Sequence, residues 1–330
     1  MMENVLVVGG AGYIGSYMCK YLSKSGYTPV ILDNFSRGHR MAVKYGKLYE
    51  GNINDTELLE KIFTENKIGA VMHFAAYCYV GESVISPDIY YKNNVSATLN
   101  LLGAMVKKNV NAFIFSSTCA TYGNPIDVPI SEDHPQDPIN PYGRSKLMVE
   151  KILNDFSQAF DLKYICLRYF NAAGADPEEE LGEDHRPETH LIPLVLQTAL
   201  GMRDQIEIFG NDYPTHDGTC IRDYIHIDDL AQAHLLALER IMGGFSGDVY
   251  NLGNGRGYSV NDVIEKASDI TKTSIKTNVV NRRQGDPAIL VSASQKAIEE
   301  LDWRPKYHEL EAILETAWRW HKKNPKGYRE

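Results

Sequence analysis

Tyr142 and Lys146 are the two side chains whose types and spacing point most directly to chemistry. They stand four residues apart, and a helix with 3.6 residues per turn places both on one face. A lysine ammonium beside a phenol favours the phenolate, so we expect Lys146 to lower the pKa of Tyr142 toward neutrality. A tyrosine tuned in this way can accept a hydroxyl proton while a hydride leaves the same carbon. Such pairs are also common on solvated helix faces, so the interpretation depends on what precedes them.

A glycine-rich loop, GGAGYIG at residues 9–15, follows the apolar run VLVV near the N-terminus. Its glycines at 9, 12 and 15 have the spacing G-x-x-G-x-x-G, between a predicted strand and a predicted helix. Glycines at such positions permit a tight turn and let the backbone approach a pyrophosphate, which the N–H groups of the helix then bind. The loop therefore predicts a dinucleotide site with contacts from Gly9, Gly12 and Gly15.

Asp33 ends the second predicted strand, 18 residues beyond Gly15. An acidic residue about 20 residues past such a loop accepts hydrogen bonds from the ribose hydroxyls. Because a carboxylate there repels a 2′-phosphate, we expect NAD rather than NADP as the cofactor. Arg37 is the basic residue that would argue for NADP, and we discount it while Asp33 is present.

Strands and helices alternate along the first half of the chain. The expected strands are 4–10, 28–33, 47–53, 70–76, 112–118 and 164–171, and the expected helices include 55–66, 94–108 and the one that carries Tyr142. This alternation predicts an α/β fold built on a doubly wound parallel (Rossmann) sheet with right-handed crossovers.

After Asn171 the alternation loosens, which predicts a smaller mixed α/β domain toward the C-terminus. Residues 1–171 are expected to form the NAD-binding domain, with contributions from about 226–254 that rejoin the main sheet. Residues 172–225 and 255–330 are expected to bind the substrate. Small residues at the end of the fourth strand, Ala75 and Ala76, suit a close passage of the backbone past the cofactor, although tight core packing also requires them.

Composition excludes several classes of partner. A net charge of -9 leaves no basic excess for binding nucleic acid. No apolar run approaches the roughly 20 residues of a membrane span, and we expect neither a signal peptide nor a membrane partner. The five scattered cysteines are typical of reduced cytosolic thiols, so we expect a cytoplasmic protein. His185 and His190 lie near acids in GEDHRPETH, but its glycine and proline indicate a loop, and we predict no metal site there.

The whole chain resembles the extended short-chain dehydrogenase/reductases, and among them the 4-epimerases of UDP-sugars. The segments that carry the resemblance are GGAGYIGS, HFAA…VGES, YYKNNV, FIFSSTCATYGNP, NPYGRSK, RYFNAAGA, GEDHRPETHLIP, FGNDYPTHDGTCIRDYIHIDDLA, YNLGNG and RRQGDPA. The resemblance implies an isomerase of galactose metabolism that interconverts UDP-galactose and UDP-glucose at the sugar C4. It also implies a homodimer, formed through the helix after Asn94 and the helix that carries Tyr142.

The resemblance assigns roles to individual residues of this chain. Tyr142 is implied to be the catalytic base, Lys146 its partner and the anchor of the nicotinamide ribose, and Thr118 the hydroxyl that contacts the sugar O4. The implied NAD contacts are Tyr13, Ile14, Asp33, Asn34, Asn52, Ile53, Phe74, Ala75, Ala76, Asn93 and Phe170. The implied UDP-sugar contacts are Asn171, His190, Leu191, Arg222, Arg283 and Asp286. The two arginines also suit an acidic protein that must hold a diphosphate.

The implied mechanism is a redox cycle that leaves NAD unchanged. Tyr142 takes the 4-hydroxyl proton as a hydride passes from C4 to NAD, the 4-keto sugar turns its other face, and the hydride returns. Binding of UDP supplies energy remote from the reacting carbon. NAD is expected to stay bound through turnover.

The nearest rival is a sugar-nucleotide dehydratase or decarboxylase on the same fold. Those reactions need an extra acid beside the catalytic hydroxyl, whereas Cys119, Ala120 and Thr121 follow Thr118 here. That absence is the best argument for epimerisation. A simple ketoreductase and another sugar-nucleotide epimerase remain alternatives. A redox-sensing NAD-binding protein without catalysis would have no need for Tyr142 and Lys146 together.

Three positions depart from the family pattern or leave its outcome open. Asn52 stands where many relatives have aspartate near the adenine, and its amide oxygen still accepts a hydrogen bond. Cys78 stands where some relatives have lysine, and it is expected near the nicotinamide together with Cys119, either as a reactive or as an inert thiol. The residue that gates the space around the sugar C2 substituent is Ile289 or Leu290. Neither is a tyrosine, so we expect the pocket to admit a 2-N-acetyl group.

Overall fold

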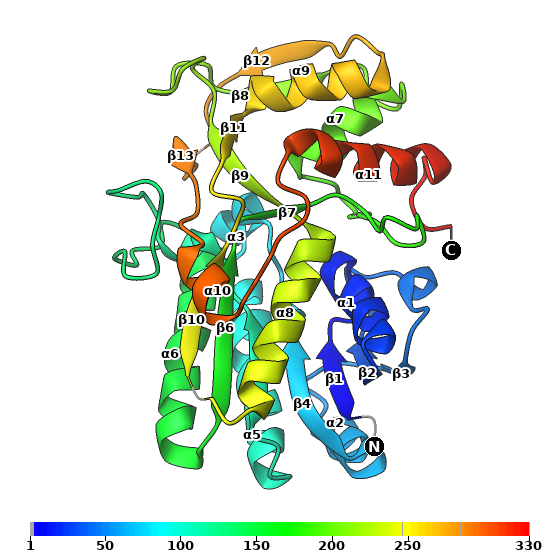
Figure 1. Ribbon diagram of the computed structural model, residues 1–330, viewed down its shortest axis with the longest axis vertical. Coiled ribbons are helices and arrows are strands. Elements are labelled where there is room, and N and C mark those ends of the chain that lie inside the picture. Colours follow the sequence, from blue (N-terminus) through cyan, green and yellow to red (C-terminus); the bar gives the residue numbers. More distant parts are fainter. Residues whose placement is uncertain (1–2, 246, 284, 330) are drawn as a thin grey trace.

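A seven-stranded parallel sheet forms the larger part of the molecule (Figure 1), in a computed structural model that describes residues 3–245, 247–283 and 285–329. Its strands are β1 (Asn4–Val8), β2 (Thr28–Asp33), β3 (Lys47–Glu50), β4 (Ile68–His73), β5 (Ala112–Ser116), β6 (Lys163–Tyr169) and β10 (Asp248–Leu252). The strand order is β10-β6-β5-β4-β1-β2-β3, so the winding direction reverses between β1 and β4. In such sheets ligands bind in the crevice at this reversal. The predicted doubly wound sheet is confirmed, including the return of residues near 250 to it.

Two layers of helices cover the sheet. Helices α1 (Tyr13–Lys24) and α8 (Ile227–Met242) pack on one face, and α2 (Thr56–Asn66), α5 (Ala97–Lys107) and α6 (Pro141–Phe160) pack on the other. Successive residues of β1 alternate between the two cores, as the two-residue period of a strand requires. Val5 and Val7 join the core under α1 and α8, while Leu6 and Val8 join the core under α2, α5 and α6.

A smaller mixed region lies above the carboxyl end of the main sheet in the view of Figure 1. Four short strands form one sheet in it: β7 (Asn171–Ala173), β9 (Ile221–His226), β11 (Gly257–Ser259) and β13 (Ile289–Leu290). Strands β8 (Ile206–Phe209) and β12 (Thr277–Val280) pair separately. Helices α7 (Leu191–Ala199), α9 (Val260–Thr271) and α11 (Leu310–Lys323) surround a third apolar core. The predicted smaller C-terminal region is therefore present, although its strand pairing was not predicted.

The remaining helices are short. They are α3 (Val80–Ile85), α4 (Pro87–Tyr90) and α10 (Gln295–Glu300), with 3-10 turns at Arg40–Ala42 and Cys119–Thr121. The helix predicted over 94–108 is preceded by a π-helical turn, Tyr91–Ser96, and α5 itself begins at Ala97. Within the described residues, no helix combines the length and the apolar character needed to cross a bilayer.

Helix α6 carries Tyr142 and Lys146 and is fixed at its start and along its length. The Asn140 side chain accepts a hydrogen bond from Gly143 N at 2.9 Å and caps the helix. About one turn beyond Lys146, Glu150 forms a buried ion pair with Arg168 of β6, with Oε2–Nη2 at 2.6 Å and Oε1–Nε at 3.0 Å. A bidentate pair of this kind fixes orientation as well as distance. The start of α6 is therefore held rigidly against β5 and β6.

Candidate active site

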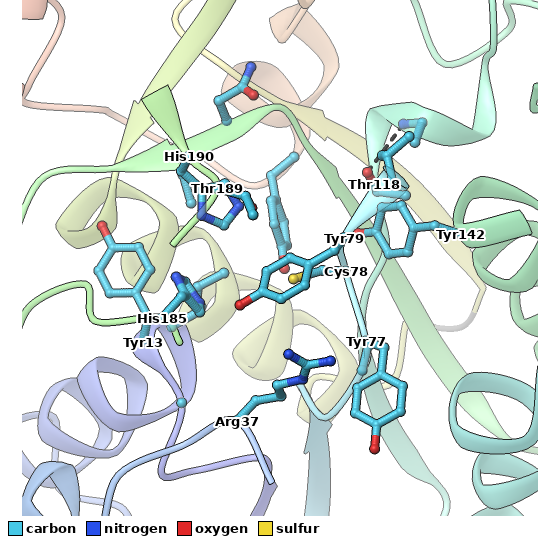
Figure 2. Close-up of a pocket in the computed structure, with 18 of the residues that line it drawn as sticks. Tyr13, Arg37, Tyr77, Cys78, Tyr79, Thr118, Tyr142, His185, Thr189 and His190 are labelled. Carbon is cyan, nitrogen blue, oxygen red and sulfur yellow. Dashed lines mark hydrogen bonds between the residues drawn. The ribbon is translucent and has the colours of Figure 1, made fainter. Parts of the chain in front are cut away.

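One cavity of about 490 Å³ lies where the carboxyl ends of β1 and β4 meet the smaller region. Figure 2 shows its walls, with Tyr13 and Arg37 from the glycine-loop side and Thr118 and Tyr142 on the opposite side. Every residue that the sequence assigned to a site lines this cavity: Gly9, Gly12, Tyr13, Ile14, Gly15, Asp33, Asn34, Asn52, Ile53, Phe74, Ala75, Ala76, Asn93, Thr118, Tyr142, Lys146, Phe170, Asn171, His190, Leu191, Arg222, Arg283 and Asp286. The structure thus brings together residues from nearly the whole length of the chain.

The three loop glycines are required for different reasons. Gly9 has a φ of +84°, and a Cβ there would lie 2.6 Å from the backbone nitrogen of Ala75. A Cβ on Gly15 would lie 2.1 Å from the carbonyl oxygen of Gly9, so the loop and α1 pack backbone against backbone. A Cβ on Gly12 would meet only the Gly9 oxygen, at 3.5 Å, and Gly12 lines the cavity. The loop therefore leaves room at the start of α1 for the close approach of a pyrophosphate, as NAD requires.

Asp33 closes the loop from the end of β2. Its Oδ2 accepts from Ala11 N at 2.9 Å and its Oδ1 accepts from Phe35 N at 2.8 Å. Burial raises the pKa of Asp33, and these backbone hydrogen bonds partly oppose the rise. Arg37 donates from Nη2 to both carboxylate oxygens of Glu82, at 2.8 and 2.9 Å, and lies over the ring of Tyr79. Because Arg37 already has a carboxylate partner, the geometry supports discounting it as a 2′-phosphate ligand.

Tyr142, Thr118 and Lys146 meet where β5 ends and α6 begins. Burial raises the pKa of Tyr142 well above its usual value, and a hydrogen bond with Thr118 opposes the rise. Lys146 Nζ donates to the carbonyl oxygen of Ser116 at 2.8 Å and lies over the ring of Phe115, and burial lowers its pKa to about 8. The expected lowering of the Tyr142 pKa by Lys146 stays a prediction: burial of the phenol dominates here, and the Lys146 ammonium points to the backbone.

Tyr142, Thr118 and Lys146 form the catalytic corner of the cavity, and Asn94 helps to position it. Asn94 was not predicted as a site residue from the sequence. It is buried in the π-helical turn, accepts from Tyr77 N at 2.9 Å and donates to Tyr77 O at 3.0 Å. It also donates to Ser145 Oγ at 3.0 Å, and Ser145 in turn donates to the carbonyl oxygen of Tyr142 at 2.7 Å. Asn94 therefore ties the strand-four loop to the first turn of α6. The sequence carries no signal for this role, because Asn94 is the first residue of the helix predicted over 94–108, where asparagine is a common cap.

The far end of the cavity carries the two predicted arginines. Arg222 of β9 forms an ion pair with Asp286 and donates to the carbonyl oxygen of Pro287 at 2.8 Å. Arg283 lies over the ring of Phe209 at 4.4 Å. Among the residues that the structure describes, Arg283 has no acidic partner within ion-pair distance. One arginine is thus fixed in place, and the other remains available for an anionic ligand.

The two cysteines predicted near the nicotinamide both line the cavity as free thiols, Cys78 half-buried and Cys119 buried. Burial raises the pKa of Cys119 to about 12, so its thiol stays protonated at neutral pH. A protonated thiol is a poor nucleophile, which favours the inert interpretation for Cys119.

A cluster of two histidines and two glutamates, Glu183, His185, Glu188 and His190, forms in the loop before α7. Burial would lower the pKa of His185, but the neighbouring carboxylates of Glu183 and Glu188 raise it to about 10. The predicted loop is confirmed between β7 and α7. The convergence of these four side chains was not predicted, because the spacing of residues within an irregular loop does not specify where their side chains point.

The fold, the glycine loop and the Tyr142–Lys146 corner define an NAD-dependent short-chain oxidoreductase site. The NAD dependent epimerase/dehydratase family matches this chain over residues 5–253. The chain belongs to that family.

Close relatives cover nearly all of the chain. A UDP-glucose 4-epimerase of Halalkalibacterium halodurans is 51% identical over 324 residues, which are 98% of this chain and 97% of that protein. The structure of a UDP-glucose 4-epimerase from Bifidobacterium longum in complex with NAD+ and UDP is 39% identical, with a TM-score of 0.94, over 98% of this chain and 100% of that one. The UDP-Glc/GlcNAc 4-epimerase of Campylobacter jejuni is 42% identical, with a TM-score of 0.84, over 97% of this chain and 99% of that one.

The glycine geometry predicts different outcomes for two matched substitutions. Gly12→Ala should leave the melting temperature nearly unchanged but weaken NAD binding at least tenfold, about 1.4 kcal/mol, because its methyl group occupies the space of the pyrophosphate. Gly15→Ala should lower the melting temperature as well, because its methyl group overlaps the Gly9 carbonyl. The measurements are NAD released per chain on denaturation, NAD affinity and thermal unfolding. Wild-type NAD affinity in Gly12→Ala would contradict the proposed position of the pyrophosphate.

Proposed function

We propose that this chain interconverts UDP-galactose and UDP-glucose by oxidising the sugar C4 to a ketone and reducing it from the opposite face. One observation carries the proposal: within the described residues a single cavity joins the Tyr142 corner to Arg222 and Arg283, and the groups that act most on the pKa of Tyr142 include no carboxylate. The groups that act most on its pKa are Tyr169, Cys78, Thr118 and Cys119. An elimination or decarboxylation needs an acid at this place, whereas an epimerisation does not. The names of the relatives agree with this reading.

Tyr142 is proposed as the base that holds the 4-hydroxyl proton and later returns it. Thr118 hydrogen-bonds the phenol and is placed to orient O4 of the sugar. NAD held at the glycine loop and Asp33 would supply the hydride acceptor for C4, and the positive charge of its oxidised ring would favour the phenolate form of Tyr142. Lys146 stays within the wall, where its ammonium can turn from the Ser116 carbonyl to a ribose hydroxyl. The proton therefore moves between Tyr142 and O4 only.

The UDP part is proposed to bind at the far end of the cavity. Arg283 can give a diphosphate a bidentate contact, while Arg222 is aligned by Asp286. Asn171, His190 and Leu191 line the space between the two ends. Because these contacts lie away from C4, they can hold the nucleotide while the keto sugar turns.

The proposed positions of NAD and of the UDP-sugar assign one ligand mainly to each part of the fold. We assign NAD binding to residues 1–171 with 226–254, and UDP-sugar binding to 172–225 and 255–330. A homodimer through α5 and α6 is supported by exposed apolar side chains on both helices, Leu99 and Met148, which are 41% and 43% exposed. We place the protein in the cytoplasm on the strength of its scattered free cysteines.

Tyr142→Phe tests the proposed chemistry. With UDP-galactose and no added NAD, the wild-type protein should form UDP-glucose, because NAD stays bound through turnover. The variant should lose 10²- to 10⁴-fold in kcat and keep its NAD content. Tyr164→Phe, at a buried tyrosine outside the cavity, is the control and should leave kcat unchanged.

Two outcomes would overturn the proposal. A loss below tenfold in Tyr142→Phe would remove this residue as the base. A stable 4-keto or deoxy product from the wild-type protein would establish the dehydratase reaction instead.

The pocket is also proposed to admit UDP-N-acetylglucosamine and UDP-N-acetylgalactosamine. Of the two candidate gate residues, Leu290 lines the cavity and packs with Cys119 and Phe170, whereas Ile289 does not line it. Leucine leaves space that a tyrosine would fill. The Campylobacter jejuni relative, named for both UDP-Glc and UDP-GlcNAc, supports the same reading.

Leu290→Tyr should therefore lower kcat/KM for the N-acetylated sugars at least a hundredfold, about 2.7 kcal/mol, and change that for UDP-galactose much less. Ile289→Tyr, one residue away, is the matched control and should leave the ratio near wild type. The hypothesis fails if the kcat/KM of the wild-type protein for the acetylated sugars is below about a thousandth of its kcat/KM for UDP-galactose, roughly 4 kcal/mol of discrimination.

A further inference from the structure

We propose that Glu183, His185, Glu188 and His190 bind one zinc ion in the loop between β7 and α7. Each residue offers one ligand atom, and the four atoms lie within 4.8 Å of one another. Figure 2 shows the two imidazoles close together on the cavity wall, with ring centroids 4.9 Å apart. This inference does not depend on the proposed epimerase activity, because it concerns the loop and not the reacting carbon.

Four nitrogen–oxygen distances in the cluster are close to those of a tetrahedral site. His185 Nδ1 lies 3.2 Å from Glu183 Oε1 and 3.6 Å from Glu188 Oε2. His190 Nδ1 lies 2.9 Å from Glu183 Oε1 and 3.0 Å from Glu188 Oε1. Zinc bonds of about 2.0–2.1 Å in tetrahedral geometry place neighbouring ligand atoms about 3.3 Å apart. With one oxygen from each glutamate, ligand atoms that lie within 4.8 Å of one another would draw closer together around an ion.

Burial of the carboxylates provides a second, independent argument. The side chains of Glu183 and Glu188 are 5% and 6% exposed, and that of His185 is 16% exposed. Two desolvated carboxylates require two compensating positive charges close by. Within the described part of the chain, the buried Nδ1 atom of His185 lies near both carboxylates yet makes no hydrogen bond of acceptable geometry. One divalent cation would supply both charges and bond this nitrogen.

The chemistry of the ligands selects the metal. Two imidazole nitrogens and two carboxylate oxygens suit zinc, whereas magnesium and calcium prefer six or more oxygen ligands. A site with four protein ligands is of the closed, structural type. It would fix the loop at the cavity wall just before α7 begins at Leu191. Coordination through Nδ1 would also leave Nε2 of His190 as the protonated nitrogen, available to a phosphate oxygen.

The alternative is an ion-pair network in which two imidazolium ions neutralise the two carboxylates without a metal. The two are distinguished with protein that lacks a histidine tag. Its metal is first removed with a chelator, and the protein is then dialysed. Zinc alone is then added, bound metal is counted by mass spectrometry and thermal unfolding is recorded. We expect one zinc per chain and a rise in melting temperature on addition. Cobalt in its place should give the intense visible bands of a tetrahedral complex.

Variants locate the ion. Glu188→Gln should bind zinc at least about 100-fold more weakly and lose the zinc-dependent rise in melting temperature, with its circular dichroism unchanged. Glu179→Gln, at a partly buried glutamate of the same loop, is the matched control and should bind as the wild type does. No stoichiometric zinc in the wild-type protein would overturn the proposal in favour of the ion-pair network. Equal zinc affinity in Glu188→Gln and wild type would place the metal elsewhere and also overturn it.

Discussion

Desolvation of Tyr142 and Lys146 is the constraint on which the site depends. Burial raises the pKa of the phenol and lowers that of the ammonium to about 8, so the corner disfavours charge on both groups. A phenolate there needs a ligand that brings its own positive charge, and the base is thereby coupled to an occupied cofactor site. Three contacts keep the corner in place: the Asn140 cap, the Asn94–Ser145 hydrogen bond and the buried ion pair of Glu150 with Arg168.

The groups proposed to bind the nucleotide lie at the other end of the cavity from the groups proposed to react. The reacting groups sit at the end of the main sheet, and the arginines come from β9 and the segment before β13. A sugar that is held mainly through its nucleotide needs few contacts around C4. It can therefore present either face of C4 to the same base. Among the described residues, the groups that act most on the pKa of Tyr142 include no carboxylate, which fits epimerisation rather than elimination.

Much of this arrangement could be predicted from the sequence, because it depends on local patterns. The apolar runs and intervening helices predicted the parallel sheet, and the loop glycines predicted a dinucleotide site. That loop lies where the strand order reverses in the structure. The rest depends on directions that a sequence does not encode. Lys146 turns to the Ser116 carbonyl, Asn94 reaches Ser145 across two helices, and the side chains of the 183–190 loop converge only after the backbone has folded. Of the two gate candidates, the register of β13 against β9 decided for Leu290.

The central claim is that a hydride leaves C4 of the sugar and returns to the same carbon within one chain. UDP-galactose carrying deuterium at C4 tests it most directly, when it is converted in ordinary water and the product is read by NMR and mass spectrometry. The account predicts UDP-glucose with the full deuterium content still at C4. Loss of the label to water, or its appearance at another carbon, would contradict the account.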